Sequence, residues 1–89
     1  MEIVREAVAG TLESSDVLVR VEPCDHCLEI VIESPVRRQF YEDIKKVVDL
    51  TLADFSVTKG RICLNDRGAL DCVIAARLET AILRGGERQ

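Results

Sequence analysis

The feature that most constrains the fold is a change in the spacing of apolar residues near residue 34. Residues 16–22 (D-V-L-V-R-V-E) and 28–33 (L-E-I-V-I-E) alternate between two faces, which is typical of half-buried strands. Farther along, apolar side chains recur at three- and four-residue steps, which predicts one long amphipathic helix. The stripe consists of Val36, Phe40, Ile44, Val47, Val48, Thr51 and Phe55. A fold with both strands and helices is therefore required.

The remaining elements complete a small α+β domain. Residues 7–12 predict a weaker strand, in which the small residues Ala9 and Gly10 allow close backbone approach. Residues 61–65 predict another strand, N-D-R-G at 65–68 a turn, and residues 69–84 a second helix. The face of this helix is formed by Leu70, Ile74, Leu78, Ala81 and Ile82. We predict a single domain over residues 1–89, with a small antiparallel sheet and two helices packed on one face, in the order βββαβα.

Two local signals refine this prediction. The connector P-C-D-H-C is short and turn-rich, so the strands at 17–22 and 28–33 are expected to pair as an antiparallel hairpin. Their Val17/Val19/Val21 and Leu28/Ile30/Ile32 faces are expected to carry the first helix. Ser34 can cap that helix and Pro35 suits its first position, so it is predicted over 35–55.

Composition excludes several classes of partner. The 89 residues carry a net charge of −4, which argues against nucleic-acid binding and against docking on an anionic membrane. The sequence shows neither a signal peptide nor an apolar run long enough to span a membrane. We therefore expect a cytoplasmic protein with its four cysteines reduced.

Catalytic and metal-binding motifs are weak. Cys24-Asp-His-Cys27 can place two thiolates in one turn, but a closed zinc site needs four ligands, and Cys63 and Cys72 do not form a second pair with that spacing. A thioredoxin-like site needs the motif to open a helix, whereas a strand follows it here. His26 is the only histidine and shares no motif with a serine. We predict no catalytic residues and no metal, and a carrier or binding role; an unmodified, zinc-clipped interaction module remains an alternative.

Two blocks of sequence resemble a known family. Residues 7–16 (A-V-A-G-T-L-E-S-S-D) and 66–81 (D-R-G-A-L-D-C-V-I-A-A-R-L-E-T-A) are similar to the acyl carrier protein of citrate lyase, its gamma subunit. The resemblance implies that Ser14 carries 2'-(5''-phosphoribosyl)-3'-dephospho-CoA through a phosphodiester, attached by a separate transferase. The family usually has Gly at the next position, where this chain has Ser15.

The resemblance also implies partners and a role. The arm would carry acetyl and citryl thioesters between the alpha (acyl transferase) and beta (citryl lyase) subunits while citrate is cleaved to oxaloacetate and acetate. The carrier itself would be non-catalytic. The carrier subunit of malonate decarboxylase uses the same prosthetic group and is the alternative within this class. The Cys24–Cys27 motif is not part of the family pattern.

Overall fold

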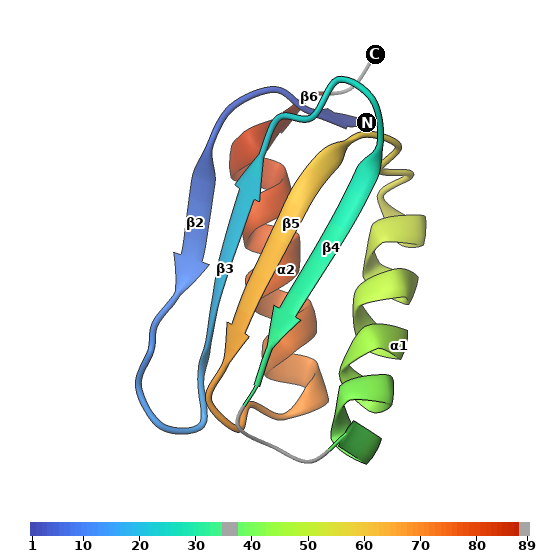
Figure 1. The fold of residues 1–89 in the computed structure, drawn as a ribbon. Coiled ribbons are helices and arrows are strands. Elements are labelled where there is room, and N and C mark those ends of the chain that lie inside the picture. The colour runs from blue at the N-terminus through green and yellow to red at the C-terminus, as the bar shows by residue number, and fades with distance from the viewer. Residues whose placement is uncertain (35–37, 88–89) are drawn as a thin grey trace.

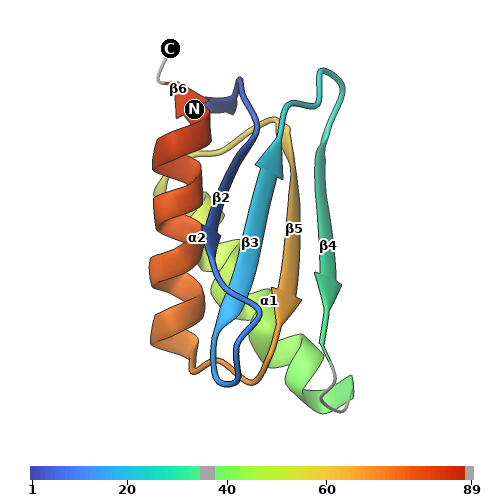
Figure 2. The same ribbon diagram turned by 90° about the vertical axis from the view of Figure 1, so that its left-hand side faces the viewer.

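The computed structural model describes residues 1–34 and 38–87. It confirms the α+β class, with two helices on one face of a four-stranded sheet (Figures 1 and 2). The strands of this sheet are β2 (Ala7–Gly10), β3 (Val17–Glu22), β4 (Leu28–Glu33) and β5 (Gly60–Asp66). The helices are α1 (Arg38–Asp54) and α2 (Asp71–Gly85), and two further strands, β1 (Glu2–Ile3) and β6 (Gly86–Glu87), pair with each other. In the part of the chain that is described, neither helix is long and apolar enough to cross a bilayer.

The order of strands differs from the prediction. The sheet runs β2-β3-β5-β4, so β5 lies between the two strands that were expected to form a hairpin. Strand β3 is antiparallel to β5, with Val21 opposite Ile62, and β4 is parallel to β5, with Ile30 opposite Ile62. The predicted direct pairing of 17–22 with 28–33 is wrong, and the sheet is mixed instead of wholly antiparallel.

The chemistry of the strands explains this order. Parallel neighbours need a long crossover connection, and α1 supplies it between β4 and β5. Strand β5 buries Ile62 and Leu64 almost completely and suits the centre of the sheet. Strand β4 exposes Glu29 and Glu33, and charged side chains are a common feature of edge strands. The connector between β3 and β4 therefore crosses the end of β5.

The core lies between the sheet and the two helices. Val17, Val19 and Val21 are completely buried, as predicted, and Ile30 and Ile32 of β4 pack partly buried against the core. The described α1 residues that are buried are Ile44, Val48, Thr51 and Leu52, and those of α2 are Ile74, Leu78, Ala81, Ile82 and Gly85. Leu52 was not predicted. Leu70, which was predicted on the buried face, occupies the N-cap position of α2 without a side-chain capping bond and is 70% exposed.

One part of the helix prediction is not covered by the structure. The expected start at Pro35, and Val36 of the apolar stripe, lie outside the described residues, as does the side chain of Phe40.

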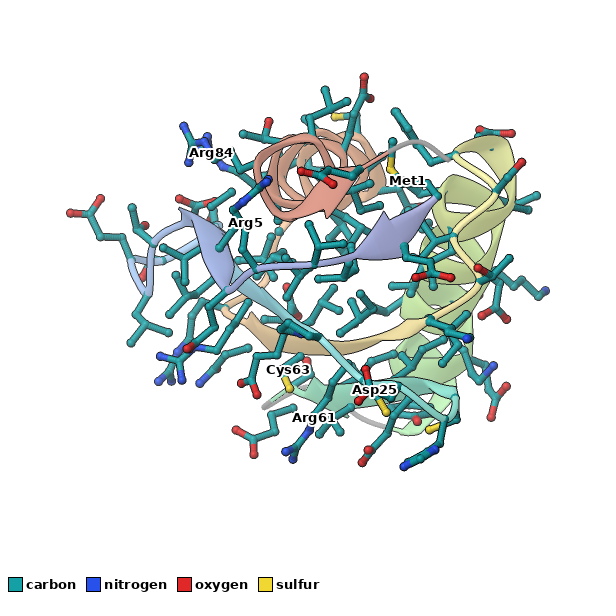
Figure 3. The ribbon with its side chains drawn as sticks, turned by 90° about the horizontal axis from the view of Figure 1, so that it is seen from above. Met1, Arg5, Asp25, Arg61, Cys63 and Arg84 are labelled. Carbon is teal, nitrogen blue, oxygen red and sulfur yellow. The ribbon has the colours of Figure 1, made fainter. Side chains whose placement is uncertain are left out.

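The two ends of the long axis carry different loops. The molecule extends 36 Å along this axis, with the loop between β2 and β3 and the start of α2 at one end (Figure 1). The chain termini and the loop between β3 and β4 lie at the other end. Viewed from that second end, Arg61 and Cys63 project from the face of the sheet away from α2, and Asp25 lies in the loop between β3 and β4 (Figure 3).

Candidate functional site

The loop between β2 and β3 contains the predicted site residue Ser14. The amide of Asp16 donates to the carbonyl of Glu13 at 3.2 Å, which closes a four-residue turn with Ser14 and Ser15 at its corner. Of the four turn residues, Glu13 to Asp16, only the third, Ser15, has a positive φ, at 64°. This pattern matches a type II turn. Ser14 is exposed, and its hydroxyl has no hydrogen-bond partner among the described residues. This hydroxyl is therefore free to react without loss of a structural contact.

Asp16 organises the turn from inside. Its Oδ2 accepts a hydrogen bond from the Thr11 hydroxyl at 2.7 Å, and its Oδ1 accepts one from the Val17 amide at 2.8 Å. The Thr11 hydroxyl in turn accepts from the amide of Glu13 at 3.2 Å. These bonds from Thr11 and Val17, together with Arg77, lower the pKa of Asp16 to about 2. The Asp16 carboxylate is therefore ionised near neutral pH.

Residues far away in sequence complete the network. The amide of Ser15 donates to the carbonyl of Arg67 at 2.8 Å, and the amide of Arg67 donates to the carbonyl of Asp16 at 2.9 Å. These two bonds continue the pairing of β3 with β5 into the turn. From α2, the Arg77 Nε donates to Asp16 Oδ1 at 3.1 Å. The two sequence blocks that carry the resemblance thus meet at one end of the molecule.

Sequence reasoning did not assign roles to Arg67 or Arg77. Both lie in the second block, 66–81, and that membership was the only available signal. Their contacts connect positions more than 50 residues apart, with Arg77 and Asp16 separated by 61. The spacing of residues within one segment cannot predict a contact between segments so far apart in sequence.

Gly10 allows the turn to begin. It has a φ of 89°, in the region that favours glycine, and a Cβ at this position would lie 1.8 Å from the carbonyl oxygen of Val17. The small size of this residue was expected to permit close backbone approach, and the structure confirms it. Within G-T-L-E-S-S-D, Gly10, Thr11 and Asp16 therefore build the turn, while Leu12, Ser14 and Ser15 are exposed at its surface.

The loop before α2 is fixed by a buried carboxylate. Asp66 is 2% exposed; its Oδ1 accepts from the amide of Ala69 at 2.9 Å and its Oδ2 from the Ser34 hydroxyl at 2.8 Å. These bonds connect the end of β4 to the loop that carries Arg67. Asp66 was expected in a turn, and it is instead the last residue of β5. The segment to which the turn with Ser14 is hydrogen-bonded, through Arg67, is therefore itself held in place.

Comparison with known proteins identifies relatives along the full chain. Residues 4–85 match the acyl carrier family described as the malonate decarboxylase delta subunit. A citrate lyase acyl carrier protein of Enterobacter sp. (strain 638) is 55% identical over 89 residues, which is 100% of this chain and 92% of the relative. One from Pectobacterium carotovorum is 53% identical over 100% of this chain and 93% of its own, and one from Albidiferax ferrireducens is 55% identical over 94% and 87%.

The chain belongs to the citrate lyase acyl carrier protein family.

A second turn of this family member, which contains Cys24 and Cys27, lies at the opposite end of β5 from the turn with Ser14. The sulfurs of Cys24 and Cys27 are 3.4 Å apart, and both residues and His26 reach solvent to some degree. No cluster of three or more potential ligands (His, Cys, Asp or Glu) that could hold a metal occurs within the described ranges. The only imidazole of this carrier-family chain thus lies a strand length away from Ser14, roughly 20 Å for the residues of β5.

Proposed function

We propose that this chain is the acyl carrier subunit of citrate lyase, and that Ser14 carries its prosthetic group. The observation that carries the proposal is an exposed serine hydroxyl without a hydrogen-bond partner in the described residues, on a turn that other residues hold in place. The names of the relatives, which are citrate lyase acyl carrier proteins, supply the acyl chemistry.

The turn fits the covalent attachment of a large group. Because Ser14 makes no side-chain hydrogen bond within the described part of the chain, a phosphodiester on its Oγ would break none there. The type II geometry places this residue at the outer corner of the turn, and the neighbouring side chains of Leu12 and Glu13 are exposed as well. When bound, the phosphoribosyl-dephospho-CoA group supplies a long arm that ends in an acyl-carrying thiol.

The chain does not activate its own serine. The charged groups in the network that holds the turn are Asp16, which is bonded to Thr11, Val17 and Arg77, and the guanidinium of Arg77 itself. With a pKa of about 2, Asp16 is a poor general base near neutral pH. A separate transferase must therefore deprotonate the Ser14 hydroxyl and deliver the prosthetic group. The residues of this chain hold the backbone of the turn in place and leave the Ser14 side chain exposed to that enzyme.

The role of the carrier is then positional. A rigid turn on a compact domain sets where the arm begins, and tethering raises the local concentration of the acyl group at partner sites. The partners on this proposal are the alpha and beta subunits of citrate lyase. The malonate decarboxylase assembly is the second candidate, because the matching family model carries the name of its delta subunit.

Intact mass measurement tests the attachment site. The purified chain is incubated with the prosthetic-group transferase and its precursor, and the modified peptide is mapped. Wild type and Ser15→Ala should gain the mass of the group on Ser14, and Ser14→Ala should gain nothing while it keeps its fold by circular dichroism. An adduct on Ser15, or on neither serine, would show the assignment to be wrong.

Reconstitution separates the two assemblies. The loaded, acetylated carrier should support citrate cleavage by citrate lyase alpha and beta subunits and should serve malonate decarboxylase subunits poorly, because docking depends on surface complementarity. Equal or better activity with the malonate system would reverse this ranking.

A further inference from the structure

The turn from Pro23 to Cys27 holds two thiols in a fixed frame. Its first flank is held by the pairing of Glu22 with Arg61, and its second flank by the pairing of Leu28 with Gly60. The amide of Gly60 also donates to the carbonyl of Cys27 at 3.1 Å. The turn therefore spans the end of β5 between two anchored points, which are about 9–10 Å apart for strands two positions apart in a sheet. This frame limits how far the cysteines can separate.

The two sulfurs are in van der Waals contact. They lie 3.4 Å apart, and a disulfide requires about 2.05 Å. Cys27 is exposed and Cys24 is half-buried, so a small molecule can reach the pair. Cys63 and Cys72 have no other cysteine sulfur within hydrogen-bonding distance in the described residues. Of the four cysteines, which all lie in the described residues, only Cys24 and Cys27 have their sulfurs in contact.

The surroundings distinguish the two thiols. The backbone N–H of His26, and to a smaller extent the thiol of Cys27, lower the pKa of the Cys24 thiol. The hydrogen bond with Cys24, together with burial, raises the pKa of the Cys27 thiol. A thiolate is the attacking species in disulfide exchange, and the partner with the higher pKa is then available to resolve the intermediate. The geometry and the chemistry therefore assign different roles to the two residues.

We propose that Cys24 and Cys27 form a thiol–disulfide exchange site that takes small-molecule disulfides as its oxidant, with Cys24 as the attacking thiol and Cys27 as the resolving thiol. In the first step the Cys24 thiolate attacks one sulfur of a disulfide RSSR, which forms a mixed disulfide on Cys24 and releases RS⁻. In the second step the Cys27 thiol gives its proton to the released thiolate and attacks the Cys24 sulfur, which releases a second RS⁻. The second RS⁻ takes from solvent the proton that Cys24 released on ionising, so two protein thiols lose two electrons and two protons, and RSSR is reduced to two RSH.

This site is independent of the proposed carrier function. The turn lies at the end of the molecule opposite the loop between β2 and β3 (Figure 1), and neither Cys24 nor Cys27 contributes to the network around Asp16. The labelled Asp25 marks this turn in the view along the long axis (Figure 3). A doubly substituted Cys24→Ser, Cys27→Ser chain should therefore fold and accept the prosthetic group like the wild type under reducing conditions.

A redox titration with glutathione tests the proposal. The reduced chain, with Cys63→Ser and Cys72→Ser to remove the other thiols, is equilibrated in buffers of increasing oxidised glutathione, quenched with acid and mapped by mass. We expect a loss of two hydrogens, about 2 Da, located between Cys24 and Cys27 and reversed by dithiothreitol, with a two-electron dependence on the buffer potential. The absence of this disulfide in excess oxidised glutathione would overturn the proposal.

Single substitutions in the same background test the assigned roles. Cys27→Ser should accumulate a mixed disulfide with glutathione on Cys24. Cys24→Ser should form the corresponding adduct on Cys27 several-fold more slowly at pH 7, because the backbone N–H of His26 lowers the pKa of the Cys24 thiol and no such bond acts on Cys27. Equal rates for the two variants would contradict the assignment of Cys24 as the attacking thiol. Stoichiometric Zn²⁺ that stays bound through the titration and blocks oxidation would overturn the exchange site in favour of a metal site.

Discussion

The loops at the two ends of β3 are held in place by different groups. In the loop before β3, side chains and backbone groups from three segments hold the turn, and the exposed Ser14 hydroxyl takes no part in that network. In the loop after β3, the neighbouring strands hold the flanks, and the two reactive groups contact each other. The first arrangement offers a hydroxyl to an external enzyme, whereas the second prepares two groups to react with each other. The two loops therefore differ in whether the group proposed to react lies outside the hydrogen-bond network, as Ser14 does, or contacts its partner, as the two cysteines do.

The strongest test of the comparison removes the close approach at the start of the first loop. Gly10→Ala should destabilise the protein by more than about 2 kcal/mol, because the new Cβ meets the carbonyl of Val17 as well as an unfavourable φ. Gly68→Ala is the matched control: its φ is 90°, but nothing lies within 4 Å of the added Cβ, so about 1 kcal/mol is expected. Urea unfolding measures both. Equal losses would mean that the contact with Val17 contributes nothing.

An intermediate effect is expected when the charge at the centre of the network is removed. The pKa of Asp16 is lowered from 3.8 to about 2, so its carboxylate stabilises the fold fully above about pH 4, and that contribution is lost as the pH falls through about 2. Asp16→Asn should lower the melting temperature at pH 7, and the difference from wild type should shrink between pH 4 and 2. Glu79→Gln removes an exposed charge from α2 and should leave the melting temperature nearly unchanged. A difference that stayed constant down to pH 2 would exclude this linkage.

The smallest effect concerns the corner of the turn. Ser15 has a φ of 64°, which costs a side-chain-bearing residue about 1 kcal/mol, and glycine avoids that cost but loses about 0.5–1 kcal/mol of stability through its more flexible unfolded chain. Ser15→Gly should therefore change the free energy of unfolding by between 0 and about +0.5 kcal/mol, while Ser15→Ala should not stabilise. Chemical denaturation resolves the difference. Destabilisation by Ser15→Gly would show that the Ser15 side chain makes a contact of its own in solution.

The sequence predicted elements better than their arrangement. The alternation of Val17, Val19 and Val21 and of Ile30 and Ile32 places the two strands with their observed bounds, because face assignment depends only on spacing within a strand. The same alternation does not say which strand is the neighbour. The partner of both strands is β5, and the short connector between them suggested a hairpin that the structure does not contain.

The candidate site was predictable only in part. Gly10 could be read locally, because a small residue before a turn indicates close backbone approach. Ser14 depends on the resemblance, since nothing in the spacing distinguishes its hydroxyl from that of Ser15. The roles of Arg67 and Arg77 arise from contacts between segments that only the folded sheet brings together, so no pattern within either segment could reveal them. The proximity of the Cys24 and Cys27 sulfurs likewise needed coordinates.

The late position of β5 along the chain has a consequence for biosynthesis. A nascent chain that has not yet reached Gly60 has β3 and β4 but lacks the strand that lies between them, so Val21 and Ile30 have no partner at Ile62. The turn with Ser14 is also incomplete until Arg67 and then Arg77 leave the ribosome, because these residues bond to Ser15 and Asp16. Pairings between residues so distant in sequence form slowly compared with local ones. An enzyme that recognises the formed turn would therefore act on the released chain, and a truncated translation product would escape modification.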